Sequence, residues 1–282
     1  MVSFGCHAFV LIGSWDTDSG NRAIRMIGEY GFDVIEIPLL KPAEFDAASH
    51  RAALAEAGIR AVCSLTLPRE LHMPENPEGA RAFLIDALDK TAEVGSSFLG
   101  GCIAYSLGRL TGAPPTDAER QTVIDVLRDL AGEAAKRGIT LALEACNRYE
   151  TYMYNTLEDT RSTIRAVGAD NLVLHADTYH MNIEEEGFYT PIVNAADALA
   201  YIHMSESHRG LLGSGTVSWE QVWRGLVEIG YSGTLTLESF AAINPDLAAA
   251  TCLWRPPRQP AEVIARDGLA FLKAGAAQAG LM

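Results

Sequence analysis

Four side chains that can bind a metal ion follow four successive apolar segments of the chain. Each stands at the same relative place, where a segment typical of a buried strand ends. The four are Glu144, Asp177, His203 and Glu238. Strand interiors favour apolar, β-branched and aromatic residues, and a single polar strand end would be ordinary. Because the event recurs in four consecutive segments, we expect the four side chains to act together.

Three carboxylates and one imidazole have the chemistry of a divalent cation site. Carboxylates held close together repel one another strongly unless a cation lies between them. Ligands that are mainly oxygen, with one imidazole, favour Mn²⁺, Mg²⁺ or Co²⁺ over a structural zinc ion. The sequence therefore predicts a site for one of these ions, Mn²⁺ first, if the fold brings the four strand ends together.

The elements that must position these residues repeat as apolar strand, polar loop, amphipathic helix and glycine. The four candidate ligands are separated by 33, 26 and 35 residues, about one strand-and-helix unit each time. Thr116 with Glu119, and Ser218 with Gln221, are predicted to cap the starts of two helices. Helices are expected over residues 20–31, 47–57, 78–94, 116–138, 156–168, 191–198, 218–230 and 261–274.

Strands that alternate with helices predict a parallel sheet with right-handed crossovers. Eight such units fit a (β/α)₈ TIM barrel, with residues 1–282 as a single domain. In this fold the active site lies at the C-terminal ends of the strands, where the four candidate ligands would converge. The competing fold is an open doubly wound sheet, which needs a glycine-rich phosphate turn after the first strand. Residues 7–15 contain no such turn, so we expect the barrel.

The composition argues against several classes of partner. Asp and Glu number 36 against 22 Lys and Arg, which gives a formal net charge of −14. An acidic surface repels phosphate backbones and anionic lipid, so we expect neither a nucleic acid nor a membrane as a partner. No apolar run is long enough to span a membrane, and residues 1–11 lack the features of a signal peptide. Four of the five cysteines lie in apolar runs, which favours a reducing cytoplasm.

Four motifs resemble a known enzyme family. They are Glu-Ala-Cys-Asn-Arg-Tyr-Glu at 144–150, Asp-Thr-Tyr-His-Met-Asn-Ile-Glu-Glu at 177–185, His-Met-Ser-Glu-Ser-His-Arg at 203–209 and Leu-Glu-Ser-Phe at 237–240. In these motifs the sequence resembles the D-tagatose 3-epimerase family of ketose 3-epimerases. That family includes the D-psicose (allulose) and L-ribulose 3-epimerases and belongs to the xylose-isomerase-like barrels. The resemblance extends from Gly5 to Arg255, and residues 206–209 resemble the L-ribulose 3-epimerase branch most.

The resemblance implies an activity and a role for each matching residue. The activity is epimerisation at C3 of free ketoses such as L-ribulose, D-tagatose, D-fructose or D-psicose. The four strand-end residues match the metal ligands, and Glu144 and Glu238 also match the two acid/base residues. Glu150, His180 and Arg209 match residues that hold the oxygens O1 to O3 of the sugar. A divalent ion at the C2 carbonyl and C3 hydroxyl would stabilise the enediolate, while one glutamate removes the C3 proton and the other returns it from the opposite face.

Other residues near the strand ends are candidates for the rest of the pocket. His7, Trp15 and Phe240 are expected to shape its far end, and Glu36 is expected to accept a hydrogen bond there. His175 is predicted to belong to the barrel wall or to pack behind a ligand, and His50 to lie on the surface. His208 could lie on a loop surface or at the pocket rim. The glycines of residues 210–216 are predicted to form a mobile cover over a free sugar in preference to a phosphate cradle.

Several alternatives stay open from the sequence. An aldose–ketose or hydroxypyruvate isomerase would use the same barrel but move a proton between C1 and C2. A phosphoesterase of the endonuclease IV type would need more histidine ligands and a basic groove, and a sugar-binding protein would not need two opposed carboxylates. Trp219 and Trp223 share a helix face, where they could pack within the chain or form a subunit contact. The resemblance implies a homodimer or a homotetramer.

Overall fold

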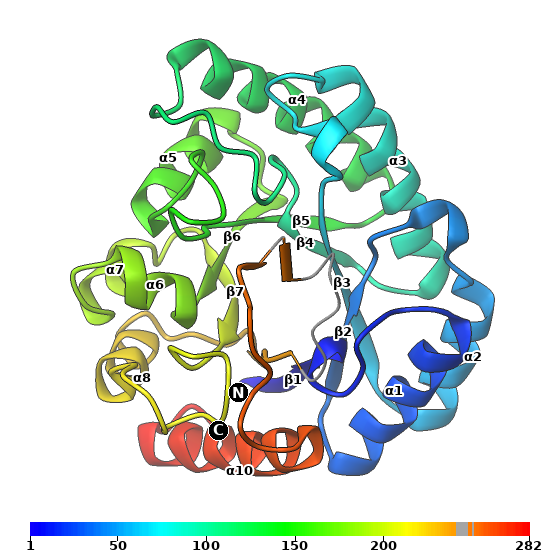
Figure 1. Cartoon of the computed structure of the whole chain (residues 1–282), viewed down its shortest axis with the longest axis vertical. Coiled ribbons are helices and arrows are strands. Elements are labelled where there is room, and N and C mark those ends of the chain that lie inside the picture. Colours follow the sequence, from blue (N-terminus) through cyan, green and yellow to red (C-terminus); the bar gives the residue numbers. More distant parts are fainter. Residues whose placement is uncertain (241–247, 250) are drawn as a thin grey trace.

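Parallel pairing of eight strands closes the centre of the molecule into a barrel (Figure 1). The computed structural model describes residues 1–240, 248–249 and 251–282. Each strand pairs with its neighbours in sequence, and β1 closes the ring against β8. The strands are β1 (Ser3–His7), β2 (Val34–Pro38), β3 (Arg60–Thr66), β4 (Phe98–Cys102), β5 (Thr140–Glu144), β6 (Leu172–Asp177), β7 (Leu199–Met204) and β8 (Thr234–Leu237). The predicted (β/α)₈ barrel is confirmed.

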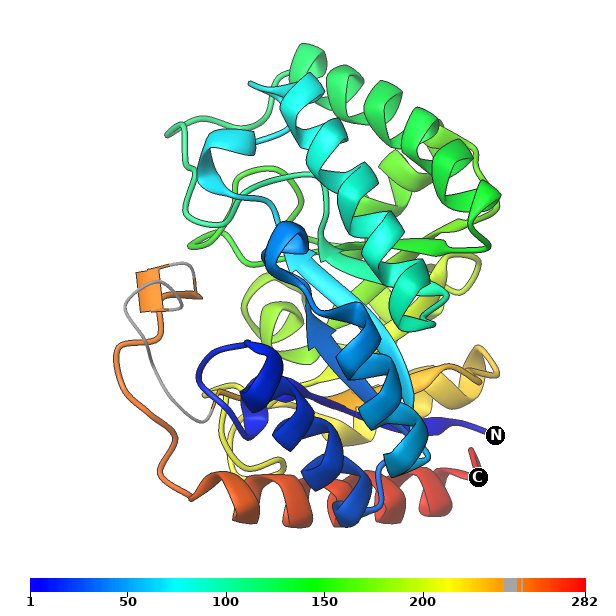
Figure 2. The ribbon, with the colours of Figure 1, turned by 90° about the vertical axis from the view of Figure 1, so that its right-hand side faces the viewer.

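Helices surround the barrel on its outside (Figure 1). The α-helices are α1 (Thr17–Tyr30), α2 (Ala47–Ala57), α3 (Pro77–Val94), α4 (Asp117–Lys136), α5 (Leu157–Val167), α6 (Thr178–Glu184), α7 (Tyr189–Asn194), α8 (Trp219–Glu228) and α10 (Ala261–Ala279). Short 3₁₀ helices are η1 (Ala8–Val10), η2 (Pro42–Glu44) and η3 (Arg69–Leu71). The two chain ends lie close together beside α10 (Figure 2). There the backbone N–H of Val2 donates to the carbonyl oxygen of Leu281 at 3.1 Å.

Helix starts follow local capping chemistry at most of the predicted positions. The Thr116 hydroxyl accepts from the backbone N–H of Glu119, and the Glu119 carboxylate accepts in return, so the predicted capping box is confirmed. The Thr156 hydroxyl accepts from the backbone N–H of Asp159 and so caps α5. Helix α1 begins at Thr17, earlier than predicted, because the Asp16 carboxylate accepts from the backbone N–H of Ser19.

Near the end of the chain one predicted cap was wrong, and the bounds of two predicted helices differ from the structure. Ser218 makes no capping hydrogen bond, and the Gln221 side chain instead accepts from the backbone N–H of Phe188 at 3.0 Å. The helix expected over 191–198 is α7 (Tyr189–Asn194), and the short α6 was not predicted. Helix α10 continues to Ala279, past its predicted end.

The strand register decides which side chains meet at the open end of the barrel. Glu144 pairs with His175 across β5 and β6, and Asp177 pairs with His203 across β6 and β7. Because parallel strands run in one direction, the last residues of β5 to β8 reach the same edge.

None of the helices that the structure describes is long and apolar enough to cross a membrane. All five cysteines are free thiols.

Candidate active site

The four predicted metal ligands lie together at the C-terminal ends of β5 to β8. Nδ1 of His203 is 3.6 Å from Oε1 of Glu144, 3.9 Å from Oδ2 of Asp177 and 3.3 Å from Oε2 of Glu238. All four residues are buried, with Asp177 fully enclosed. One nitrogen therefore faces an oxygen from each of three carboxylates, which is the arrangement of a possible metal-binding site.

The protein's own groups fit a divalent cation at this point. Nδ1 of His203 has no hydrogen-bond partner among the described residues, while Nε2 of the same ring lies 2.7 Å from Oε2 of Glu36. Burial lowers the pKa of His203, but Glu238 and Glu36 outweigh it and raise the pKa well above its usual range, so a metal ion at Nδ1 would displace a proton there. Burial raises the pKa of Asp177 to about 7, with Arg209 acting in the opposite direction and Glu238 raising it further. A cation among these carboxylates would offset their repulsion.

The two predicted acid/base residues both have lowered pKa values. Burial alone would raise the pKa of Glu238, but Arg209 and His203 hold it well below its usual range. For Glu144, burial likewise opposes ionisation, and His175 and His203 outweigh it and lower the pKa. Both side chains are therefore carboxylates at neutral pH, which is the form that can accept a proton.

Arg209 brings its positive charge to these carboxylates from the turn after β7. Its Nη1 lies 2.7 Å from Oδ2 of Asp177 and also contacts Oε2 of Glu238. The guanidinium carbon is 4.0 Å from the centre of the Tyr179 ring and 5.3 Å from that of Phe240. The backbone of Arg209 takes a positive φ of 57°, an uncommon conformation for a residue with a side chain. Its burial and aromatic contacts fix the direction of the guanidinium.

Asn147 holds two predicted substrate-binding residues in place, a role that the sequence did not reveal. Its side-chain amide donates to Oε1 of Glu150 at 2.7 Å and lies 2.8 Å from Nδ1 of His180. The backbone N–H of Asn147 also donates to this Nδ1, at 3.1 Å. Because Nδ1 accepts, the proton of neutral His180 is on Nε2, which points toward Asp177 at 3.7 Å. Burial and Arg209 lower the pKa of His180 to about 3, so the ring is neutral.

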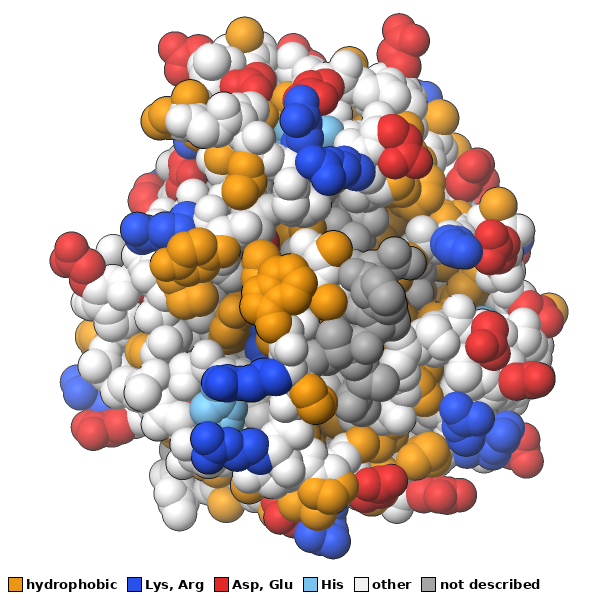
Figure 3. All heavy atoms as spheres, viewed as in Figure 1, with side chains coloured by type: hydrophobic (Ala, Val, Ile, Leu, Met, Phe, Trp, Pro, Cys, Tyr) orange, Lys and Arg blue, Asp and Glu red, His pale blue; other side chains and the backbone are white. Residues whose placement is uncertain are grey.

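A cavity of about 910 Å³ opens over these residues. All seven predicted substrate-binding residues line it, as do the candidate ligands other than Asp177. The seven are His7, Trp15, Glu36, Glu150, His180, Arg209 and Phe240. On the face that looks down the barrel, charged side chains of both signs are spread around the edge (Figure 3). Among the residues that the structure describes on this face, no basic groove of the kind that a phosphoesterase for nucleic acid would need is seen (Figure 3).

The wall of the cavity near α1 and α2 differs from the prediction. His50, expected on the surface, is buried, and its Nε2 accepts from the indole N–H of Trp15 at 3.2 Å. The indole also stacks on Phe45, with ring centres 6.4 Å apart. A Cβ at Gly20 would lie within 3 Å of both Trp15 and His50. The bare backbone of α1 thus lets the indole lie against the helix, where it forms one side of the cavity.

Below the candidate ligands, a buried polar layer fills the barrel. Oε2 of Glu36 accepts from the Tyr201 hydroxyl at 2.6 Å as well as from His203, and Oε1 lies 3.7 Å from Nε2 of His7. His175 is fully buried, and neither ring nitrogen has a hydrogen-bond partner among the described residues. Its Nδ1 is 3.7 Å from Oε2 of Glu144, consistent with its predicted place behind a ligand.

The glycine-containing loop after β7 is folded around a buried carboxylate. Glu206 accepts hydrogen bonds from the backbone N–H groups of Ser207, Gly213 and Val217 and from the Trp219 indole. Residues 210–216 are absent from the described lining of the cavity, so the cover predicted over the sugar is not seen. His208 is exposed on this loop. The loop's N–H groups already have an anionic partner within the protein.

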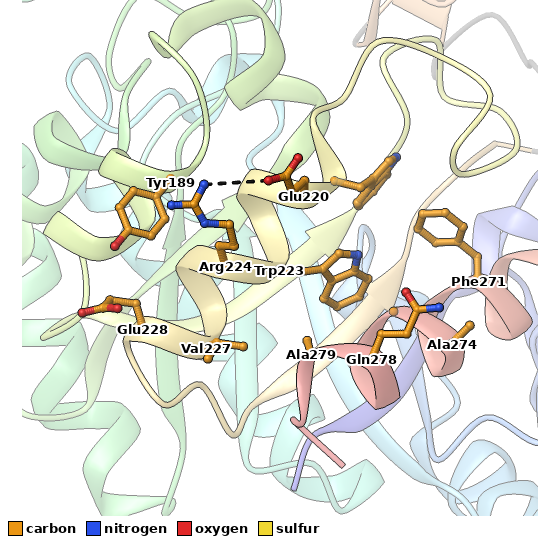
Figure 4. A pocket seen from close by; sticks show the side chains of 12 residues that line it. Tyr189, Glu220, Trp223, Arg224, Val227, Glu228, Phe271, Ala274, Gln278 and Ala279 are labelled. Carbon is orange, nitrogen blue, oxygen red and sulfur yellow. Dashed lines mark ion pairs between the residues drawn. The ribbon is translucent and has the colours of Figure 1, made fainter.

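A second hollow lies outside the barrel, between α8 and α10 (Figure 4). Its volume is about 760 Å³. The rings of Trp219 and Trp223 lie 6.5 Å apart on one face of α8, and Phe271 packs edge-on against Trp219 at 5.1 Å. Both indoles pack within the chain yet remain partly exposed. Packing within the chain is confirmed, and the subunit contact stays a prediction.

Comparisons with known proteins agree with this geometry. A family model described as xylose isomerase-like TIM barrel matches residues 24–275. The chain is 35% identical over 278 residues to the ketose 3-epimerase of Arthrobacter globiformis, covering 96% of both proteins. It is 36% identical over 278 residues to the L-ribulose 3-epimerase of Methylomonas sp. (strain DH-1), covering 96% of this chain and 97% of that protein.

A solved structure shows the same similarity. The crystal structure of D-allulose 3-epimerase from Methylomonas sp. in complex with D-allulose superposes with a TM-score of 0.93 at 35% identity, covering 97% of this chain and 96% of that chain. Sequence and structure thus agree over nearly the whole length of the protein. The chain belongs to the xylose isomerase-like TIM barrel family and, within it, to the ketose 3-epimerases.

Proposed function

We propose that the chain inverts C3 of a free ketose, with Glu144 and Glu238 as its two acid/base residues. The observation that carries this is the position of the two carboxylates around Nδ1 of His203, at 3.6 Å and 3.3 Å. They come from separate strand ends, and the lowered pKa values keep both ionised. One can remove the C3 proton, and the other, once protonated from solvent, can deliver a proton to C3 from the opposite face.

The neighbouring groups supply hydrogen bonds for the negative charge that develops on the sugar oxygens. The Arg209 guanidinium, whose nitrogens all donate, lies 3.2 Å from Nε2 of His180 and faces the same buried site. Burial raises the pKa of Glu150 to about 8, with Arg209 opposing the rise, so this carboxyl is largely protonated at neutral pH and can donate a hydrogen bond. Donors that the fold already holds in position stabilise such charge better than water, which must reorient.

The cation that best suits this donor set is Mn²⁺, with Co²⁺ and Mg²⁺ as alternatives. A bound divalent ion would polarise the substrate carbonyl and lower the energy of the negative charge next to it. Removing metal with a chelator is expected to abolish turnover, and Mn²⁺ or Co²⁺ should restore it. Asp177→Ala should not recover on metal addition. Full turnover in a verified metal-free preparation would contradict this part of the proposal.

The substrate that we propose is an unphosphorylated ketose such as L-ribulose or D-allulose, the sugars named for the relatives in Methylomonas. The loop after β7 supports this choice, because its N–H groups already bind the Glu206 carboxylate. A panel of free ketopentoses and ketohexoses, assayed with Mn²⁺, should contain the best substrate. A much higher kcat/KM for ribulose 5-phosphate than for every free ketose would overturn the choice.

We also propose that the chain forms a homodimer or homotetramer through the hollow beside α8. Two features support this: Val227 is 45% exposed next to the indoles, and the helix presents both Arg224 and Glu220, an ion pair at 3.9 Å (Figure 4). A face with both charges can pair with a second copy of itself about a two-fold axis. Trp223→Arg should lower the molar mass measured by light scattering, whereas a wild-type monomer would refute the interface.

The five free thiols support a cytoplasmic location.

A further inference from the structure

A second group of metal-binding atoms lies beside the acid/base residue of β5. Cys102 ends β4, and Cys146 follows β5 two residues after Glu144. The two sulfur atoms are 3.6 Å apart, and Sγ of Cys102 is 4.0 Å from Oε2 of Glu144. One ligand atom from each of the three residues lies within 4.8 Å of the others. Both cysteines line the cavity, so an ion that enters the cavity can reach them.

The distance between the sulfur atoms suits a thiophilic metal ion. In a tetrahedral site with Zn–S bonds of about 2.3 Å, two thiolates lie about 3.8 Å apart. The observed 3.6 Å is close to this value, so both sulfurs could bind one ion with little movement. A metal ion binds cysteine as the thiolate, which has lost its proton. An ion that binds both thiolates therefore releases two protons to solvent.

The two oxygens of the Glu144 carboxylate face different groups of metal-binding atoms. One faces the candidate ligands around His203, and the other faces the two cysteines. Oε1 is directed to the predicted catalytic metal position, 3.6 Å from Nδ1 of His203. Oε2 is directed to the cysteine side, 4.0 Å from Sγ of Cys102 and 3.7 Å from Nδ1 of His175, which has no hydrogen-bond partner among the described residues. Because one carboxylate serves both sides, an ion on the cysteine side competes for Glu144.

We propose that a soft divalent ion such as Zn²⁺ or Cd²⁺ binds Cys102, Cys146 and Glu144 and thereby inhibits the enzyme. Sulfur ligands select these ions, whereas Mn²⁺ and Mg²⁺ prefer the oxygen-rich set on the other side of Glu144. The bound ion draws the carboxylate away from the C3 proton. The inhibition, though not the binding, rests on the proposed function.

The test is a titration of the Mn²⁺-loaded enzyme with Cd²⁺. Binding is followed by the ultraviolet charge-transfer absorption of Cd–thiolate bonds, and turnover is measured on the same samples. All variants carry Cys252→Ala, which removes the exposed cysteine. We expect one Cd²⁺ per chain to produce the absorption and to abolish turnover. Cys146→Ala and Cys102→Ser should each lose most of the absorption and need about tenfold more Cd²⁺ for inhibition, relative to their own uninhibited rates.

Cys63→Ala provides the matched control, because Cys63 is buried in β3 but does not line the cavity. This variant should bind Cd²⁺ and be inhibited like the parent. The Cys102 and Cys146 variants could instead lose the Cd–thiolate absorption and still be inhibited at the same Cd²⁺ concentration as the parent. That result would show that Cd²⁺ replaces Mn²⁺ at the oxygen-rich ligand set, and it would overturn the proposal. Absorption that depends on both cysteines in a chain without epimerase activity would support the site and refute the proposed function.

Discussion

His203 uses its two ring nitrogens in different ways. Nε2 lies 2.7 Å from Glu36, whose carboxylate also accepts from the Tyr201 hydroxyl, and that hydroxyl accepts from Thr236 at 2.7 Å. Nδ1 is left facing the three candidate carboxylate ligands. A carboxylate behind a ligating histidine fixes both the tautomer and the ring orientation. Glu36 thus acts on the metal position through His203.

The Glu36→Gln variant should bind Mn²⁺ about 10–100-fold more weakly than the parent. The neutral amide holds the Nε2 proton less strongly and leaves Nδ1 a poorer ligand. Isothermal titration of the metal-free proteins measures the difference directly. Glu44→Gln is the control, because Glu44 is exposed at the cavity and its ion pair among the described residues is with Lys41. Equal affinities for the two variants would mean that Glu36 is merely part of the wall.

Glu150 gives the metal-free protein a specific pH dependence of stability. Burial raises the pKa of this carboxyl from 4.5 in the unfolded chain to about 8 in the fold, with Arg209 partly opposing. Between these values the folded state holds a proton that the unfolded chain has released. Its contribution to the free energy of unfolding is therefore full at low pH and falls as the pH rises, by at most about 1.4 kcal/mol per unit.

Glu150→Gln should remove this dependence, because the amide does not titrate. Urea unfolding of the metal-free proteins between about pH 5 and 8 should show the parent losing stability relative to the variant as the pH rises. Parallel stability profiles for the two proteins would contradict the raised pKa.

The candidate ligands could be predicted because each stands at a strand end, and strand order follows from the order along the chain. The contact of Asn147 with His180 and that of His50 with Trp15 could not, because the two partners in each contact lie far apart in sequence. Asn147 contacts His180 across 33 residues, and His50 contacts Trp15 across 35. Neither contact leaves a local pattern.

At the scale of elements, the loop between β7 and α8 is organised by one buried side chain. Glu206 accepts from three backbone N–H groups and the Trp219 indole, which satisfies loop donors that would otherwise lie buried without partners. Gly215 lies against this carboxylate so closely that a Cβ there would collide with Glu206 and with the Ser207 hydroxyl. The loop therefore depends on a residue without a side chain at this position.

Gly215→Ala should destabilise the protein by about 1–3 kcal/mol, since the added methyl group must push the Glu206 carboxylate away from its donors. Gly132→Ala offers the opposite case, because a Cβ there meets nothing within 4 Å and the residue is exposed in α4. That substitution should stabilise the protein by roughly 1 kcal/mol. Thermal unfolding of both variants gives the comparison, and a neutral Gly215→Ala would show that the loop is not built around Glu206.

Helix limits could be predicted where the signal is local and failed where tertiary packing decides. The capping box of Thr116 and Glu119 joins residues three apart and was correct. The predicted role of Gln221 failed because its side chain bonds to the backbone of Phe188 on the neighbouring element. Gly275 does not end α10, because the Trp223 ring packs against its bare Cα and the helix continues.

At the scale of the whole molecule, closure of the barrel brings the strand ends that carry the candidate active site to one edge. Pairing of β1 with β8 completes the ring, and α10 packs against both strands from outside. The barrel could be predicted because its unit repeats along the entire chain. The preferred ketose could not, because the part of the cavity that would hold the far end of the sugar is built from side chains of several elements, among them Trp15 and Phe240.

The central claim is that one of the residues Glu144 and Glu238 removes the proton at C3 and that the other delivers a proton taken from solvent. Epimerisation in D₂O should place deuterium at C3 of the product and leave the C1 protons unlabelled, as mass spectrometry and NMR would show. Glu144→Gln and Glu238→Gln should each lose turnover while keeping the fold, because an amide cannot accept the proton. Deuterium at C1 with an unlabelled C3, together with the appearance of an aldose, would contradict the account and assign the barrel to an isomerase.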